Sequence, residues 1–396
     1  MASLVWTQRQ DIGPSARYGH ALAWDKVAED VLLVGGQGPG DLHRDTWRWN
    51  GATWTQVEDI GPPARAEHAL ASDSARSRVV LFGGRSGSGP LADTWEWDGT
   101  AWTQVADTGP SARSRHALAY DSARSRVVLF GGEDASGLLG DTWEWDGDGW
   151  TQVADTGPSA RAGHAMCFES PAARTVLFGG SDGSDTWTWN GSEWTAINDV
   201  GPEPRQATAL VFAGTITILF GGIDPTLTVL FDATWQLEGA DWTERQDIGP
   251  ADRQGHAMTY DETRQQVVLF GGSAAPSATA TTGDLFSDTW ELPSPAAPGM
   301  TTTPRLVAFG VSPDVVPQGV PFVLQVFLDQ PAQVSTSVMV GVTTGAGMFS
   351  EDVQVEAGST SGSKSVNPPV GLLSLGNNLL TATLDGVSLT ASLQVQ

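Results

Sequence analysis

The sequence predicts an all-β protein made of six similar units followed by a smaller all-β region. An apolar run that ends in a glycine pair, Val79-Val80-Leu81-Phe82-Gly83-Gly84, recurs along the chain at a spacing of about 48 residues, and a repeat of that length indicates a propeller or a solenoid. Each glycine pair precedes a Thr-Trp dipeptide, which in the second unit lies in the alternating tryptophan segment 93–99. The 47 glycines and 17 tryptophans are typical of many short strands joined by tight turns.

Each unit reads as four strands. In the second unit we expect them at 68–72, 78–83, 93–97 and 101–105. One small sheet cannot bury both of its faces, but stacking it between neighbours does so, and a ring of six leaves no exposed end. The large tryptophan side chains suit the wedge between sheets. Residues 1–292 are therefore predicted to form a six-bladed β-propeller.

The two ends of the repeat region complement each other. The sixth unit has only three strands before Pro293-Ser294-Pro295 interrupts it. The first residues, Val5-Trp6-Thr7-Gln8, match the fourth-strand sequence Ala101-Trp102-Thr103-Gln104 and have no earlier strands before them. We therefore expect the N-terminal strand to complete the sixth blade and close the ring.

The six units resemble kelch repeats. The resemblance covers 1–292 and rests on the glycine pair after an apolar strand, the tryptophan downstream and the Gly-Pro-x-x-Arg turn upstream. Typical kelch units carry mixed aromatics where these have a double tryptophan, as at Trp95 and Trp97. Units with Asp-Thr-Trp-x-Trp look like a subgroup common in large bacterial surface and secreted proteins.

A second domain is expected after a linker. Residues 293–304 are rich in Pro, Ala and Thr and read as the linker. Residues 305–396 carry few charges and contain strand-like runs at the spacing of a β-sandwich. The segment 353–360 resembles a phrase of bacterial immunoglobulin-like domains, so an immunoglobulin-like β-sandwich is predicted.

Histidines and tryptophans recur at fixed positions and are interpreted as structural. Ligands of one metal ion must lie within about 2.0–2.1 Å of it, whereas equivalent residues of different blades lie far apart. A hydrogen-bond network that ties the connection between blades to the third strand explains the repetition better. The residues are His20, His68, His116, His164 and His256, with Trp47, Trp95, Trp143, Trp187, Trp235 and Trp290.

Six arginines open the innermost strands and are expected around one mouth of the central channel. Each guanidinium either pairs with a carboxylate of its own or the next blade, or takes part in an anion site. In several kelch propellers, arginines near this face contact ligands. The candidate ligand-binding residues are these arginines and three residues of the variable loops on the same face: Arg17, Arg65, Arg113, Arg161, Arg205, Arg253, Arg85, Phe231 and Phe286.

Composition excludes several classes of function. A net charge of −25 disfavours nucleic acid and anionic membranes, and no apolar run approaches the roughly 18 residues that span a bilayer. The N-terminus lacks the basic and apolar regions of a signal peptide. The localisation is therefore left open, with an extracellular or particle-associated place favoured over a cytoplasmic one.

No catalytic or cofactor-binding motif is found. Galactose oxidase also joins a kelch propeller to an immunoglobulin-like domain, but its copper site requires a Tyr–Cys pair, a further Tyr and a His from the last domain. Residues 293–396 contain neither His nor Tyr. The one cysteine, Cys167, lies in an apolar run and is expected to be a buried thiol. We expect no catalytic residues, no metal and no cofactor.

These observations predict a non-catalytic binding or structural module of a surface, secreted or particle-associated assembly. It would recognise a protein or a glycan through the propeller loops, because loops on a rigid scaffold carry function. The C-terminal domain would dock it to a larger assembly. Two alternatives stay open: a soluble carbohydrate-binding lectin, and a hydrolase or lyase with carboxylates in the channel.

Overall fold

The computed structural model divides the chain into two compact units, Ser3–Pro295 and Ala296–Gln396, and each is described by itself. The residues that the structure describes are 5–9, 12–58, 60–181, 183–198, 201–245, 249–275, 282–294, 306–312, 315–317, 321–328, 336–344, 347–356, 359, 361–366, 376–384 and 387–395.

The first unit consists of six four-stranded antiparallel sheets, or blades. From the inside outward, blade one consists of β2 (Ala21–Asp25), β3 (Asp30–Val34), β4 (Thr46–Trp49) and β5 (Trp54–Glu58), and blade two of β6 (Ala69–Asp73), β7 (Arg78–Phe82), β10 (Thr94–Trp97) and β11 (Trp102–Ala106). Blade three consists of β12 (Ala117–Asp121), β13 (Arg126–Phe130), β16 (Thr142–Trp145) and β17 (Trp150–Ala154), and blade four of β18 (Ala165–Glu169), β19 (Arg174–Phe178), β20 (Thr186–Trp189) and β21 (Trp194–Asn198). Blade five consists of β22 (Ala209–Phe212), β23 (Thr217–Phe220), β24 (Thr234–Glu238) and β25 (Asp241–Arg245), and blade six of β26 (Ala257–Asp261), β27 (Gln266–Phe270), β28 (Thr289–Pro293) and β1 (Thr7–Gln8).

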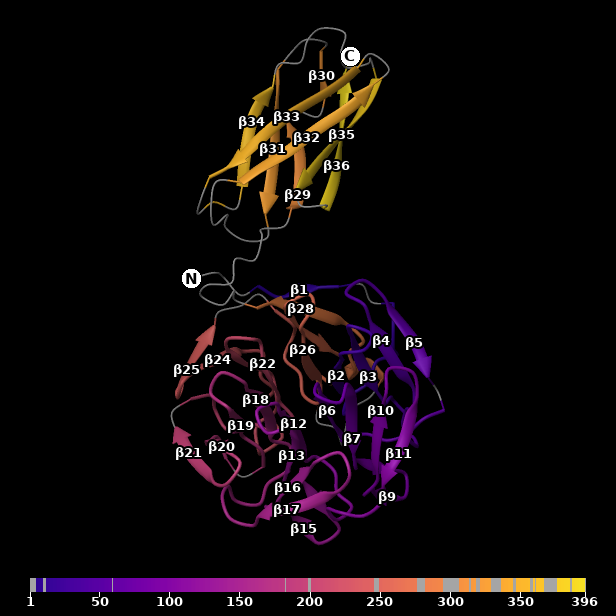
Figure 1. The fold of residues 1–396 in the computed structure, drawn as a ribbon, viewed down its shortest axis with the longest axis vertical. Coiled ribbons are helices and arrows are strands. Elements are labelled where there is room, and N and C mark those ends of the chain that lie inside the picture. Colours follow the sequence, from indigo (N-terminus) through magenta and orange to yellow (C-terminus); the bar gives the residue numbers. More distant parts are fainter. Residues whose placement is uncertain are drawn as a thin grey trace. The chain divides into compact units, whose positions relative to one another are not determined.

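The blades form a ring (Figure 1). Strands β2, β6, β12, β18, β22 and β26 surround the centre, and each contacts the innermost strands of the blades before and after it. Apolar cores lie between blades rather than within them: Leu32 of blade one and Leu70 and Leu81 of blade two belong to one buried cluster. The predicted six-bladed propeller is confirmed.

The N-terminal strand closes the ring, as predicted. Strand β1 pairs with β28 in antiparallel register, Thr7 opposite Glu291 and Gln8 opposite Trp290. Trp6 is buried and donates its indole N–H to Thr234 Oγ1 of blade five at 3.0 Å. The N-terminal strand β1 and the last strand of the repeat region, β28, therefore belong to the same sheet.

A repeated tryptophan–threonine bond links successive blades. The tryptophan of each outermost strand donates from Nε1 to the threonine that opens the third strand of the preceding blade. The pairs are Trp54–Thr289, Trp102–Thr46, Trp150–Thr94, Trp194–Thr142, Trp242–Thr186 and Trp6–Thr234, at 2.8–3.0 Å. Because each bond crosses a blade boundary, it fixes the rotation of one sheet against the next.

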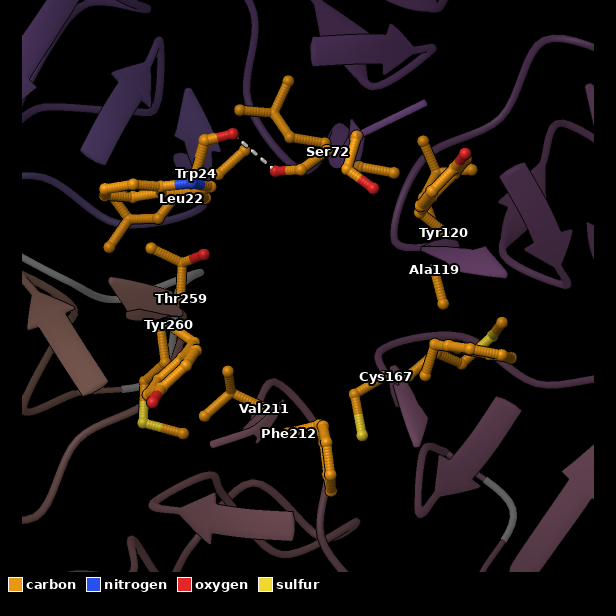
Figure 2. Close-up of a pocket in the computed structure, with 18 of the residues that line it drawn as sticks. Leu22, Trp24, Ser72, Ala119, Tyr120, Cys167, Val211, Phe212, Thr259 and Tyr260 are labelled. Atoms are coloured by element: carbon orange, nitrogen blue, oxygen red, sulfur yellow. Dashed lines mark hydrogen bonds between the residues drawn. The ribbon is translucent and has the colours of Figure 1, made fainter. Parts of the chain in front are cut away.

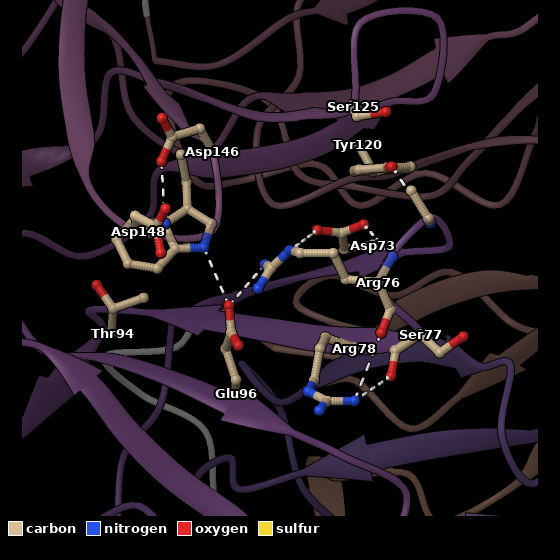
Figure 3. A network of polar contacts seen from close by, with 12 residues as sticks. Asp73, Arg76, Ser77, Arg78, Thr94, Glu96, Tyr120, Ser125, Asp146 and Asp148 are labelled. Atoms are coloured by element: carbon tan, nitrogen blue, oxygen red, sulfur yellow. Dashed lines mark hydrogen bonds and ion pairs between the residues drawn. The ribbon is translucent and has the colours of Figure 1, made fainter.

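A network of charged side chains lies at one end of the propeller (Figure 3). We call this end the turn face, because here the first strand of each blade turns into the second. In blade two Arg76 donates to Asp73 at 2.7 Å and to Glu96 at 2.6 Å. Glu96 also accepts from Trp145 Nε1 of blade three at 3.1 Å. The sequence analysis did not anticipate this network.

The second unit has two sheets over one core. Strands β29 (Leu306–Ser312), β31 (Phe322–Leu328) and β34 (Ser361–Val366) form one sheet, and β30 (Val315–Val316), β36 (Val387–Val395), β35 (Gly376–Leu384), β32 (Thr336–Thr344) and β33 (Gly347–Val355) form the other. Buried residues of both, such as Leu324 and Leu380, share one cluster. This arrangement is compatible with a β-sandwich, while the immunoglobulin-like character stays a prediction. Strand β28 extends to Pro293, and 295–304 of the predicted linker lie outside the described residues.

Candidate binding site at the loop face

The loop face is the end of the propeller that carries the connections between blades and the loops between second and third strands. The glycine pairs build it. Gly84 donates its N–H to the carbonyl of Arg113 in the next blade at 2.9 Å, and a Cβ on Gly83 would lie 2.8 Å from that oxygen. Both glycines have positive φ, +60° and +92°, which glycine adopts without strain. The same N–H to carbonyl bond recurs in all six blades.

The six arginines are buried, with at most 1% of their surface exposed. Arg113 donates from Nη1 to Asp141 Oδ1 at 2.7 Å and from Nη2 to Asp141 Oδ2 at 2.9 Å. Trp143 Nε1 donates to the same Oδ2 at 2.7 Å. Five blades share this Arg–Asp–Trp arrangement: Arg17–Asp45–Trp47, Arg65–Asp93–Trp95, Arg113–Asp141–Trp143, Arg161–Asp185–Trp187 and Arg253–Asp288–Trp290.

Four of the paired carboxylates have lowered pKa values. Burial alone would raise the pKa of Asp93, but the hydrogen bonds and charge of Arg65 together with the bond from Trp95 hold it below the ordinary value. The same balance lowers the pKa of Asp45, Asp141 and Asp185. Each of these carboxylates, bonded to its arginine and tryptophan, fixes the connection between blades to the third strand.

Blade five departs from the pattern. Ala233 stands where the other blades have the aspartate, and Arg205 pairs with Glu203, which is 66% exposed. Burial lowers the pKa of Arg205 to about 10, against the raising effect of Glu203. Trp235 Nε1 is buried and donates no hydrogen bond to any residue that the structure describes.

The histidines contact a different element than expected. His116 Nε2 lies 3.1 Å from the carbonyl oxygen of Phe82, which ends the second strand of the preceding blade, and His20 and His164 contact Phe270 and Phe130 in the same way. The bond thus crosses a blade boundary and does not reach the third strand of its own blade. Burial, with a smaller effect of the neighbouring arginine, lowers the pKa of each of these three imidazoles to about 3.

Two candidate loop residues cover arginines. The ring of Phe231 lies over the guanidinium of Arg205, with 3.9 Å between Cζ and the ring centroid. Phe286 lies over Arg253 at 4.0 Å. Both rings therefore pack back on the propeller through cation–π contacts.

A closed ring of backbone hydrogen bonds lies at the start of the innermost strands. One residue per blade donates its N–H to the carbonyl of its counterpart in the blade before, at 2.6–2.9 Å. All six have positive φ, between +52° and +70°. The members are Gly19, Glu67, Arg115, Gly163, Ala207 and Gly255. The only trace of this ring in the sequence is the Gly-His dipeptide of three units, which did not predict it.

Side chains that do not repeat gather beside this ring, and we call them the mouth cluster: Tyr18, Gln37, Glu67, Arg85, Arg115, Glu133 and Gln206. Arg85 donates to Glu67 at 2.8 Å and to Gln37 at 2.7 Å. Arg115 lies 3.3 Å from Glu133 and donates to Gln206 Oε1. The first set of contacts joins blades one and two, and the second joins blades three and five.

Short hairpins frame the cluster on blades two and three. Strands β8 (Arg85–Ser86) and β9 (Gly89–Pro90) form one, and β14 (Glu133–Asp134) and β15 (Gly137–Leu138) form the other. Arg85 and Arg115 keep 32% and 27% of their side-chain surface exposed, so both are accessible to a ligand. Of the predicted ligand-binding residues, Arg85 joins the cluster and the six repeated arginines lie buried beneath the face.

A cavity lies on the propeller axis (Figure 2). The cavity measures about 450 Å³ and is lined by the innermost strands from the position of Leu22 down to their turns, with Trp24, Tyr120, Phe212 and Tyr260 around it. Ser72 interrupts this aromatic belt and donates to the carbonyl of Trp24 at 2.7 Å. Cys167 also faces the cavity, and burial raises the pKa of its thiol.

Metal and membrane features complete the description. In the part of the chain that the structure describes, no group of three or more His, Cys, Asp or Glu side chains is placed to hold a metal ion. Within the same part, no helix is long and apolar enough to cross a membrane.

Comparisons with known proteins agree with this architecture. Residues 1–148 match the family model described as the KLHDC2/KLHL20/DRC7 Kelch-repeats domain. A solved structure titled "Structure of YjhT" aligns over 70% of this chain and 95% of its own, with a TM-score of 0.55 and 12% identity, which shows a common fold. No curated protein matches the chain. Kelch propellers generally mediate protein interactions. The N-terminal unit of this chain thus has the fold of a kelch-type β-propeller, and its residues 1–148 carry the match to the kelch-repeat family.

Proposed function

We propose that the propeller is a non-catalytic protein-binding module that recognises a polypeptide segment of mixed charge through the mouth cluster. The observation that carries the proposal is the asymmetry of the backbone ring. Its members in blades two and three are Glu67 and Arg115, whereas blades four to six place Gly163, Ala207 and Gly255 there. Repeated residues maintain the architecture, so the positions that break the repeat are the ones free to carry specificity.

The chemistry of the cluster suits a polypeptide. Arg85 and Arg115 supply planar donors, and Glu67 and Glu133 supply acceptors; all four are partly exposed. Each cation is paired with a carboxylate, so a partner exchanges one charged contact for another instead of desolvating an isolated charge. Complementary charges at such a mouth set specificity and association rate.

A glycan is the less favoured ligand. Sugar binding commonly uses exposed aromatic faces, but Trp49, Trp97, Trp145 and Trp189 are at most 1% exposed and pack between blades. The wider proposals, a surface, secreted or particle-associated assembly and docking through the C-terminal unit, rest on the sequence resemblance.

The test uses a displayed library of random peptides panned on the full chain. Arg85→Ser with Arg115→Ser should abolish binding of the enriched peptides. Arg78→Ser with Arg126→Ser removes the same charges from the same two blades at the turn face, where both guanidiniums bond only to nearby carbonyls, and should leave binding intact. Equal binding to both double variants, or enrichment of no peptide together with binding to a glycan array, would refute the proposal.

A further inference from the structure

Blade five lacks one acceptor that the other blades share. In each of the other five blades, one aspartate carboxylate accepts three hydrogen bonds, two from the arginine and one from the tryptophan. Asp141, for example, accepts from Arg113 and Trp143. Ala233 removes this carboxylate, while Arg205 and Trp235 keep their places.

Glu203 does not replace the missing group. It occupies the position of Ser15, Ser111 and Ser159, whose Oγ atoms accept from arginine Nη2 at 2.8–3.1 Å alongside the aspartate. Glu203 Oε2 accepts from Arg205 Nη2 at 2.9 Å in the same way. Among the described residues, Arg205 Nη1 retains only the Gly221 carbonyl as acceptor, at 3.2 Å, and Trp235 Nε1 has none.

The position is near the surface and its geometry is selective. The equivalent aspartates of the other blades are 15–34% exposed, whereas in blade five Arg205 and Trp235 Nε1 are themselves buried, so a ligand carboxylate must displace the side chains that cover these donors. Phe231 covers one flat side of the Arg205 guanidinium. The remaining in-plane N–H groups favour a planar anion that accepts two parallel bonds.

We propose that blade five is a carboxylate-binding site in which a carboxylate of a ligand takes the place of the missing aspartate side chain. It accepts from Arg205 Nη1, Arg205 Nη2 and Trp235 Nε1. The other five blades supply the template, since the same donors already hold a carboxylate there. The site is separate from the mouth cluster and does not depend on the proposed protein binding.

Acetate is the minimal probe. Sodium acetate, compared with sodium chloride at equal ionic strength, should raise the melting temperature of the full chain by on the order of 2 °C at tenfold excess over its dissociation constant. Ala233→Asp supplies the carboxylate covalently, so this variant should melt higher than the wild type without acetate and should show no acetate response. Asp93→Ala recreates the vacancy in blade two, so acetate should partly restore its lowered melting temperature.

Two further arms complete the test. A blocked aspartyl tripeptide, compared with its asparaginyl counterpart, distinguishes a protein side chain from a free organic acid: a response to acetate alone assigns the site to small acids. The proposal is overturned if acetate shifts the wild type and A233D equally, or if it shifts D93A and not the wild type.

Discussion

Trp6 and Thr234 are joined by a 3.0 Å hydrogen bond although 228 residues separate them in the chain. The bond has five counterparts around the propeller, each between an outer-strand tryptophan and the threonine of the preceding blade. In four of them the partners come from consecutive repeats, whereas Trp54–Thr289 and Trp6–Thr234 join the beginning of the chain to the last two blades. Ring closure is thus one instance of a repeated contact.

Removal of residues 1–10 is expected to open the propeller. It deletes β1 and exposes the edge of β28 and the core around Phe220. Trp6→Ala alone should cost about 3–5 kcal/mol, the usual effect of truncating a buried tryptophan. Thermal melts of the two variants measure the loss, with deletion of residues 1–4 as the control. An unchanged melt of the longer deletion would show that the ring closes without this strand.

Removal of a single aspartate from the loop face is expected to destabilise more than removal of the whole pair. Asp141→Ala leaves the buried Arg113 guanidinium uncompensated, which typically costs about 3–5 kcal/mol. The double variant with Arg113→Met should recover part of that loss. By contrast, Glu203→Gln alters a carboxylate that is 66% exposed and leaves an amide oxygen able to accept from Arg205, so stability should change by less than about 1 kcal/mol. Denaturant unfolding measures the free energy of unfolding of each variant. If the effects of Asp141→Ala and Arg113→Met simply added in the double variant, the pairing would be contradicted.

Stability is expected to fall with pH below about 6.5. His20, His116 and His164 have pKa values of about 3 in the folded state, against about 6.5 when unfolded. Because the folded pKa is depressed, the unfolded chain binds more protons, and the contribution is complete above pH 6.5 and is lost as pH falls toward 3. Each imidazole costs about 1.4 kcal/mol per pH unit inside this window.

Thermal melts measured across this pH range should therefore show the melting temperature falling already at pH values well above those at which carboxylates titrate. His116→Thr, which copies the Thr208 of blade five, should reduce the slope by the share of one histidine. An identical slope in the variant would show that His116 is not protonated on unfolding in this window.

The positive φ angles of the backbone ring predict stability changes of opposite sign for two substitutions in it. Ala207 has φ +52°, a conformation that costs a non-glycine residue about 1–2 kcal/mol. Ala207→Gly should therefore stabilise the propeller by about 1 kcal/mol. Gly255→Ala should destabilise it by a similar amount, because its Cβ would meet nothing closer than 3.4 Å and only the φ of +61° opposes it. Equal signs in denaturant unfolding would refute this account.

The repeated features were predictable and the irregular ones were not. Glycine pairs and alternating tryptophans predicted the strands of blade two to within a residue, because periodic burial leaves a periodic sequence. The partner of His116 was wrong because a sequence pattern gives a residue's strand position but not which neighbouring blade it reaches. Arg115 and Gln206 were missed because their contact joins blades three and five and no repeat encodes it.

The backbone ring also determines how the loop face can be recognised. Each of its six residues donates its N–H to one neighbour and accepts at its carbonyl oxygen from the other, so the ring has no free end. A partner therefore finds no unsatisfied ring N–H or carbonyl to pair with, and selectivity at this opening falls to side chains alone. Substitutions at Glu67 or Arg115 can accordingly change what is bound while the hydrogen bonds beneath them stay the same.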